Sequence, residues 1–194
     1  MTEIERIEDQ IKRAYGGGAW HGPSLKESLA GVTAIQASGR PLSNSHTIWE
    51  IVNHLSAWTG VVIQRLRGQP LVEPAEGDFP EHDIPEHGNV DEAAWLAALA
   101  GLERNHEALL MEVAAMDNSS LNDACAGHSV SRYAHLHGTV QHYCYHAGQI
   151  ALLKKMQDIT KRCPSAVVLG SFNLDLISWP ILGGASLFQG WPTQ

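Results

Sequence analysis

Hydrophobic residues recur every three or four positions in four stretches of the chain, as they do along one face of an α-helix. These stretches are residues 2–15, 47–66, 89–115 and 131–157. In the second stretch, Thr47 and Glu50 have the spacing of a capping box, which marks a helix start. Shorter helical turns are predicted around residues 25–29 and 34–38.

The stretches that separate these helices do not read as strands. Before Cys163, no segment alternates hydrophobic and polar residues convincingly, and residues 71–89 are rich in Pro, Gly, Asp and Glu, which is typical of a long surface connection. Four long amphipathic helices bury their apolar faces most simply by packing together. We therefore predict an all-α fold, a four-helix bundle formed by residues 1–160.

The C-terminal tail, residues 161–194, has a different pattern. It is apolar and contains Trp179-Pro180, Gly183-Gly184 and Trp191-Pro192, so it does not resemble a fifth bundle helix. So many apolar side chains are rarely left in water. We predict a mostly non-helical tail that is docked on the bundle or exchanged between subunits, and that contributes no metal ligand.

Composition and charge narrow the range of partners. The chain has 194 residues and a formal net charge of −8, and its 13 lysines and arginines do not cluster. We therefore expect no nucleic-acid partner. No apolar run is long enough to cross a membrane, and the acidic start does not resemble a signal peptide. The three cysteines include no CxxC pair, which favours reduced thiols and a cytoplasmic location.

The candidate chemistry lies in the fourth stretch, where His142 and His146 stand one helical turn apart. On a helical wheel the two residues are about 40° apart, on the side that also carries Ile150 and Leu153. The pair is therefore predicted to face the core, where each imidazole needs a polar partner. Metal coordination is one way to satisfy both rings.

A metal site needs a third protein ligand, normally from another element. His54 is the leading candidate, because it shares the core face of the second stretch with Ile51 and Trp58. His106 in the third stretch is a rival, although a hydrogen-bonded core histidine is its simpler interpretation. His135 lies on the same face as the His142 pair and is interpreted as a cap or as a group that supports the ligands.

The other histidines are expected to lie outside the site. His46 and His137 are interpreted as capping or surface groups, and four more are assigned to exposed loops: His21, His82, His87 and His128. A di-iron bundle would need two Glu-x-x-His motifs, and only Glu103-x-x-His106 has that spacing. The sequence therefore argues against a di-iron site.

Cys144 stands between the paired histidines but lies about 200° from His142 on the wheel, so it is expected to point the other way. On that back face it is joined by Val140, Ala147 and Ala151. Small apolar residues allow close approach, so we expect another helix or a twofold partner to cover this face.

Three motifs resemble the DinB-like (DinB/YfiT) superfamily. They are "HTIWEIVNHLSAW" from residue 46, "RLRG" from residue 65 and "LHGTVQHYCYHAGQIALLKK" from residue 136, within a likeness that covers about residues 7–156. The resemblance implies an up-down-down-up four-helix bundle, often dimeric, with three histidines on a divalent metal. Matched by motif, these are His54, His142 and His146, which favours His54 over His106. The family name does not imply DNA binding.

The sequence departs from this family pattern in two places. Many relatives have Asp directly after the first histidine of the pair, where this chain has Tyr143. The tail after about Arg162 matches no part of the family pattern. The first departure bears on the surroundings of the ligands, and the second on the shape of a dimer.

Characterised relatives include thiol-dependent enzymes, namely bacillithiol transferases and a mycothiol-dependent maleylpyruvate isomerase. The resemblance therefore implies a homodimeric, metal-dependent transferase, with a small-molecule thiol and an electrophile as partners. Zinc or nickel is the expected cofactor, because both ions suit imidazole ligands. Tyr145 and Gln149 are candidate polar contacts. A hydrolase that uses metal-bound hydroxide and a non-enzymatic metal-binding stress-response protein are the alternatives.

Overall fold

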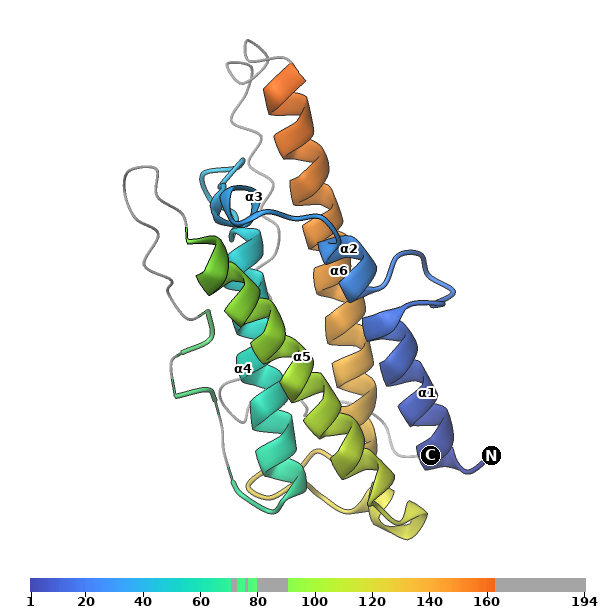
Figure 1. Cartoon of the computed structure of the whole chain (residues 1–194). Helices are drawn as coiled ribbons and strands as arrows, with labels where there is room; N and C mark the ends of the chain where they lie inside the picture. The colour runs from blue at the N-terminus through green and yellow to red at the C-terminus, as the bar shows by residue number, and fades with distance from the viewer. Residues whose placement is uncertain (71–72, 76, 80–90, 163–194) are drawn as a thin grey trace, which may run out of the picture.

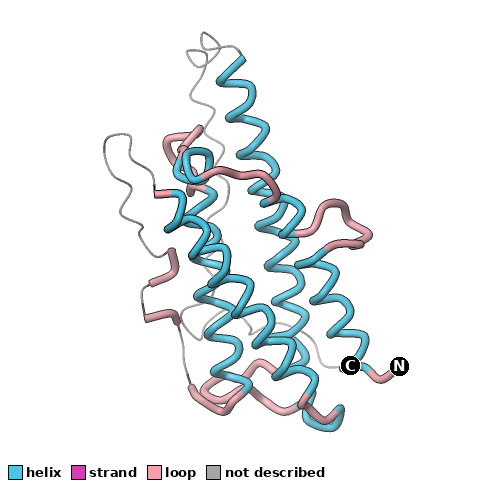
Figure 2. Tube along the Cα trace, in the orientation of Figure 1, coloured by secondary structure: helices cyan, strands magenta, loops and turns pink. Residues whose placement is uncertain are grey.

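A computed structural model describes residues 1–70, 73–75, 77–79 and 91–162. Within these residues the protein is all-α, without a β-strand (Figure 2). Its elements are α1 (Glu3–Gly16), α2 (Leu25–Leu29), α3 (Ala34–Ser38), α4 (Ile48–Leu66), α5 (Glu92–Ala114), the 3-10 helix η1 (Asn118–Asn122) and α6 (Arg132–Arg162). The predicted all-α fold is confirmed, whereas the predicted docking of the tail lies outside the described residues.

The four long helices run up, down, down and up (Figure 1). α1 and α6 point one way, and α4 and α5 run parallel to each other in the opposite direction. This is the topology that the family resemblance implies. Because α4 and α5 are parallel, the chain that joins them must travel back along the bundle, so residues 73–75 and 77–79 lie on the path that returns beside α4.

Capping fixes where the helices begin. Thr47 accepts a hydrogen bond from the Glu50 amide at 3.1 Å, and the Glu50 carboxylate accepts one from the Thr47 amide at 2.8 Å, so the predicted capping box of α4 is present. α5 differs from the prediction. Its N-cap is Asp91, whose carboxylate accepts from the Ala93 amide at 2.8 Å, and the helix starts at Glu92 rather than near residue 89.

α6 continues to Arg162, beyond the predicted end near residue 157. Residues 158–162 contain neither Gly nor Pro, and the next helix-breaking residue in the sequence is Pro164. None of the helices in the described residues is both long and apolar enough to cross a membrane.

The core lies where the apolar stripes of the long helices meet. Its largest fully buried side chains include Ile7 and Ile11 from α1, Trp49, Ile51 and Leu55 from α4, Trp95, Leu102 and Leu109 from α5, and Leu136 and Tyr143 from α6. The Trp95 indole donates a hydrogen bond to the Val32 carbonyl at 2.8 Å, which satisfies the polar end of a fully buried ring.

The back face of α6 packs on its own chain. Ala147 is buried, and Val140 and Cys144 line a cavity of about 170 Å³ together with Ala14 of α1. On the same helix, the Lys154 ammonium donates to the Ser28 carbonyl at the end of α2 at 2.8 Å. The expected covering helix is therefore supplied within the chain by α1 and α2, and the predicted homodimer does not follow from this face.

Candidate metal centre

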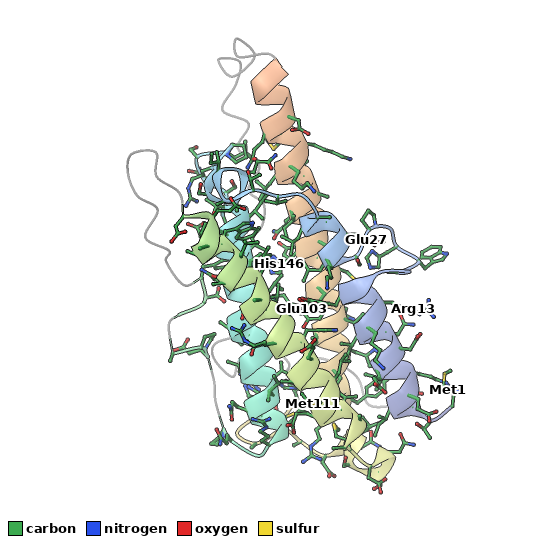
Figure 3. The ribbon with its side chains drawn as sticks, in the orientation of Figure 1. Met1, Arg13, Glu27, Glu103, Met111 and His146 are labelled. Atoms are coloured by element: carbon green, nitrogen blue, oxygen red, sulfur yellow. The ribbon has the colours of Figure 1, made fainter. Side chains whose placement is uncertain are left out.

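Three histidines from two helices meet inside the upper half of the bundle as drawn, where Figure 3 labels His146. His54 comes from α4, and His142 and His146 come from adjacent turns of α6. One ring nitrogen of each lies within 4.8 Å of the others, and the Nε2 atoms of His54 and His142 are 2.8 Å apart. His54 and His146 are buried and His142 is partly buried. The structure thus brings together the three predicted residues.

Hydrogen bonds on the far side of two rings set their tautomers. His54 Nδ1 lies 2.6 Å from the main-chain oxygen of Asp78, and His146 Nδ1 lies 2.6 Å from Gln149 Oε1. A carbonyl or amide oxygen can only accept, so Nδ1 carries the proton in both rings. The Nε2 atoms of His54 and His146 then carry a lone pair in place of a proton, which is the form that binds a metal.

The third imidazole completes the cluster without a metal by a hydrogen bond between rings. Because His54 Nε2 must accept, His142 Nε2 can donate its proton across the 2.8 Å that separates the two atoms. A cation bound at this point would replace that proton, and His142 would then carry its proton on Nδ1. The same three atoms can therefore hold either a proton or a metal ion.

Burial keeps all three imidazoles neutral near pH 7. It lowers the pKa of His146 to about 3, helped by the neighbouring His54. Burial also lowers the pKa of His54. It holds the pKa of His142 well below the ordinary value, and the neighbouring rings of His146 and His54 lower it further. Neutral imidazoles do not repel a cation, so a divalent ion would meet no fixed positive charge from its own ligands.

Residues 20–150, which include all three histidines, match the family model of the DinB superfamily. The chain belongs to the DinB superfamily. No curated protein and no solved structure matches it. Family membership agrees with the observed helix order, and the match contains the motif around His54 and the part of the α6 motif that carries His142 and His146.

Tyr143, which departs from the Asp of the family pattern described above, is fully buried. Its hydroxyl lies 3.2 Å from Thr59 Oγ1, and because the Thr59 hydroxyl donates to the Leu55 carbonyl at 2.7 Å, Tyr143 is the donor. Its ring also packs against Tyr15, with centroids 5.7 Å apart. Tyr143 therefore serves the core of the bundle, and Gln149 and Asp78 supply the hydrogen bonds behind the metal-facing rings.

The rival ligand His106 belongs to that same core. Its ring stacks on Tyr15 with centroids 3.8 Å apart and an angle of 11°, and burial lowers its pKa to about 4. It is not one of the clustered histidines. His106 is therefore a core residue as expected. The expected hydrogen bond is not confirmed, because its Nδ1 atom has no hydrogen-bond partner in the described part of the chain.

His135 does not support the ligands, contrary to one of its two interpretations. Its Nε2 accepts a hydrogen bond from Arg65 Nη1 at 3.0 Å, and its Nδ1 faces the Ser131 carbonyl at 3.4 Å. The contact with Ser131 shows that His135 interacts with the start of α6 rather than with the clustered histidines. His128, expected to be exposed, is partly buried with its ring edge-on to His135 at 5.5 Å. The error arose because η1 and the following loop fold back onto α6.

Several other expectations concern the periphery of the site. Cys144 points away from the cluster as predicted, with its sulfur 3.1 Å from Nε2 of the exposed His21. His137 is partly buried beside Tyr133. His82 and His87 lie outside the described residues. Tyr145 is 51% exposed and its ring meets the edge of His146 at 5.0 Å, so it borders the cluster.

Sequence reasoning missed two residues at the site, Asp78 and Phe79. Both belong to the connection predicted to be a surface loop, yet both contact His54. Phe79 also stacks on His46, which is exposed but has this ring contact. The only available signal was a single aromatic residue within a Pro- and Gly-rich stretch, which does not identify a contact by itself.

Proposed function

We propose that this DinB-superfamily protein is a divalent-metal-dependent enzyme, a transferase that activates a low-molecular-weight thiol. The observation that carries the proposal is the convergence of His54, His142 and His146, with hydrogen bonds that direct the lone pairs of His54 and His146 inward. Buried imidazoles with lowered pKa values that converge on one point mark a candidate functional site.

The donor set fits some metal ions better than others. Three imidazole nitrogens suit Zn²⁺ or Ni²⁺, whereas Mg²⁺ and Ca²⁺ prefer oxygen ligands. Three protein ligands are also the number found at catalytic zinc sites, which keep a further position for water or substrate. We therefore propose zinc or nickel as the cofactor, with His54, His142 and His146 as its ligands.

When bound, such an ion lowers the pKa of a coordinating thiol, so that its sulfur is a nucleophile near neutral pH. The proposed reaction is a substitution in which the sulfur of the thiol substrate would gain a bond to an electrophilic carbon of the second substrate, that carbon would lose its bond to the leaving group, and the thiol proton would depart with the leaving group. Gln149 keeps His146 oriented through the 2.6 Å bond to Nδ1. Tyr145, half-exposed beside His146, is a candidate for a substrate contact.

The experiment combines metal analysis with an activity screen on the untagged protein. We expect close to one zinc or nickel ion per chain, and consumption of an electrophile only when a low-molecular-weight thiol is present. His142→Ala should lose both, while His21→Ala, which changes an exposed histidine outside the cluster, should keep both. Turnover without a thiol would instead favour a hydrolase, and full metal occupancy without turnover would favour a non-enzymatic metal-binding protein.

The homodimer is a separate proposal that rests on the family resemblance. Sedimentation velocity of the full chain tests it, with a single species at the mass of one chain as the contrary result. The transferase proposal does not depend on that result, because all three clustered histidines come from one chain.

A further inference from the structure

Asp78 binds one turn of α4 at two points. Its main-chain oxygen accepts from His54 Nδ1 at 2.6 Å, and its carboxylate accepts from the Trp58 indole at 2.7 Å. His54 and Trp58 are one helical turn apart, so they present neighbouring donors on one face of the helix. The carboxylate also lies 3.4 Å from His54 Nδ1, which places a negative charge beside the proton of that ring.

Phe79 holds the same histidine by stacking. Its ring centroid lies 4.1 Å from that of His54 at an angle of 11°, and 3.5 Å from that of His46 at an angle of 5°. Two nearly parallel imidazoles at these distances cannot share one face of a phenyl ring, so Phe79 lies between them. The stack fixes the plane of the His54 ring, while the Asp78 bond fixes which nitrogen carries the proton.

Without these contacts His54 would have two ways to satisfy its buried ring. It could carry the proton on Nδ1 or on Nε2, and the second tautomer removes the lone pair that faces His142. The main chain of a single residue therefore decides whether the ring is ready to accept a ligand. The parallel arrangement of α4 and α5 brings this residue back to the His54 turn.

We propose that Asp78 and Phe79 are positioning residues that hold His54 in its Nδ1–H tautomer and thereby set the metal affinity of the cluster. The statement about affinity rests on the proposed metal site, whereas the statement about the tautomer does not. Hydrogen bonds behind a metal ligand typically change metal affinity by about 10- to 100-fold. Trp58 takes part indirectly, since it anchors the Asp78 carboxylate.

The test uses four variants of the full chain. Phe79→Ala removes the stack, and Phe79→Leu keeps apolar bulk but not a flat ring. Trp58→Phe keeps an aromatic ring but removes the indole donor to Asp78. Glu73→Ala is the matched control, because Glu73 is an exposed residue of the same connection. Far-UV circular dichroism and thermal unfolding establish whether each variant is folded. If the Phe79 variants do not fold, Trp58→Phe alone tests the proposal.

Two readouts are measured on each variant. Long-range ¹H–¹⁵N correlation spectra of the metal-free protein report the tautomer of His54, and competition with a chromophoric chelator reports zinc affinity. We expect the Nδ1–H tautomer in the wild type and in Glu73→Ala, and a mixture of tautomers in Phe79→Ala and Trp58→Phe. Zinc affinity should fall about tenfold in Phe79→Ala and by a smaller factor in Phe79→Leu and Trp58→Phe.

The two readouts separate this inference from the proposed function. If the wild type binds no zinc or nickel but the variants change the tautomer, the positioning role stands and the metal-dependent function falls. If the wild type binds zinc and every variant keeps both its affinity and its tautomer, the positioning role is wrong and the metal site stands. If the wild-type His54 carries its proton on Nε2, the inference is overturned directly.

Discussion

Two groups of histidines lie along α4 and α6, and they differ in whether they can bind a metal ion. Toward one end, His54 of α4 meets His142 and His146 of α6. Toward the other, Arg65 of α4 meets His135 of α6, and His128 lies edge-on against His135. In the second group His135 belongs to α6 and His128 to the loop before it, and only the first group presents converging lone pairs.

The difference lies in what the ring nitrogens contact. In the first group, Asp78 and Gln149 supply oxygens that accept from Nδ1 and leave Nε2 free. In the second, Arg65 donates to His135 Nε2 at 3.0 Å and so uses the lone pair that a metal would need. Burial lowers the pKa of His135, and the positive charge of the guanidinium lowers it further. A cation would be repelled there.

Helix geometry alone therefore does not make a metal site. The wheel places His135 on the same face as His142 and His146, and in the structure all three are turned toward the interior or partly buried. Their partners decide the chemistry, because an imidazole is a ligand only while one nitrogen is free and the other is held. The comparison between the two groups is directly testable.

The largest effect is expected from removing one ring from each group. His142→Ala should weaken zinc binding by at least about 100-fold, since a two-histidine remnant lacks the third ligand of a zinc site. His135→Ala should leave zinc affinity unchanged. Chelator competition on both variants, with circular dichroism to check folding, measures the contrast. Equal loss of affinity in the two variants would remove the distinction between the groups.

A pH dependence of stability should follow from the buried neutral rings. His146 has its pKa lowered to about 3 in the folded protein, so below its ordinary value near 6.5 the unfolded chain binds a proton that the folded chain does not. Stability is thus fully present above pH 6.5 and is lost as pH falls toward 3. One such group contributes a slope of up to about 1.4 kcal/mol per pH unit.

Urea unfolding of the metal-free protein between pH 7 and pH 5 measures this slope. His146→Leu should flatten it by a large part of that amount, because the variant has no proton to gain at this position. The remaining slope includes the contributions of the other rings with lowered pKa values, such as His106 at about 4. An unchanged slope in the variant would mean that His146 is not buried in its neutral form.

Much of this site could be predicted from the sequence. Helical periodicity predicted α4 and α6, and the family motifs favoured His54 over His106. Both predictions depend only on local sequence patterns, which can be recognised without knowledge of the tertiary structure. The contacts of Asp78 and Phe79 with His54 could not be predicted from the sequence. Their contacts depend on how the chain returns from α4 to α5, and a Pro- and Gly-rich segment carries no periodicity that would reveal its path.

The surroundings of Tyr143 and His135 show the same limit. The sequence placed both on α6, but not the partners that reach them, Thr59 and Arg65, because those depend on the rotation and depth of α4 against α6. Local pattern thus predicts which face a residue occupies. It does not predict which donor or acceptor stands opposite, and that is the property that separates the two histidine groups.

A smaller effect is expected from the hydrogen bond behind His146. Gln149→Leu keeps the volume of the side chain but removes the oxygen that accepts from Nδ1. Zinc affinity should fall about tenfold, the lower end of the usual range for such partners. Gln149→Glu, which retains an acceptor, should bind at least as tightly as the wild type. Chelator competition on the pair of variants separates the loss of the acceptor from a general disturbance of the helix.

In the second group, Arg65→Met should raise the pKa of His135 by removing the guanidinium that lowers it. Burial is the larger cause and remains, so the pKa should stay below its ordinary value. ¹⁵N chemical shifts followed through a pH titration measure the change, with His106, which owes its low pKa mainly to burial, as the internal control. Zinc affinity should not rise, because His135 and His128 supply only two imidazoles. A fall in the pKa of His135 would reverse the assigned role of Arg65.

The smallest effect on the protein itself is expected at Tyr145, which borders the first group. Its ring is half-exposed and meets His146 at 5.0 Å, and its hydroxyl makes no hydrogen bond within the described residues. Tyr145→Phe should therefore change the free energy of unfolding by no more than about 0.5 kcal/mol and leave zinc affinity unaltered. If Tyr145 contacts the substrate, the same variant should still lower thiol-dependent turnover. Chemical denaturation, chelator competition and the activity assay together decide between a substrate contact and a surface residue, because only the former loses turnover while stability and metal affinity stay constant.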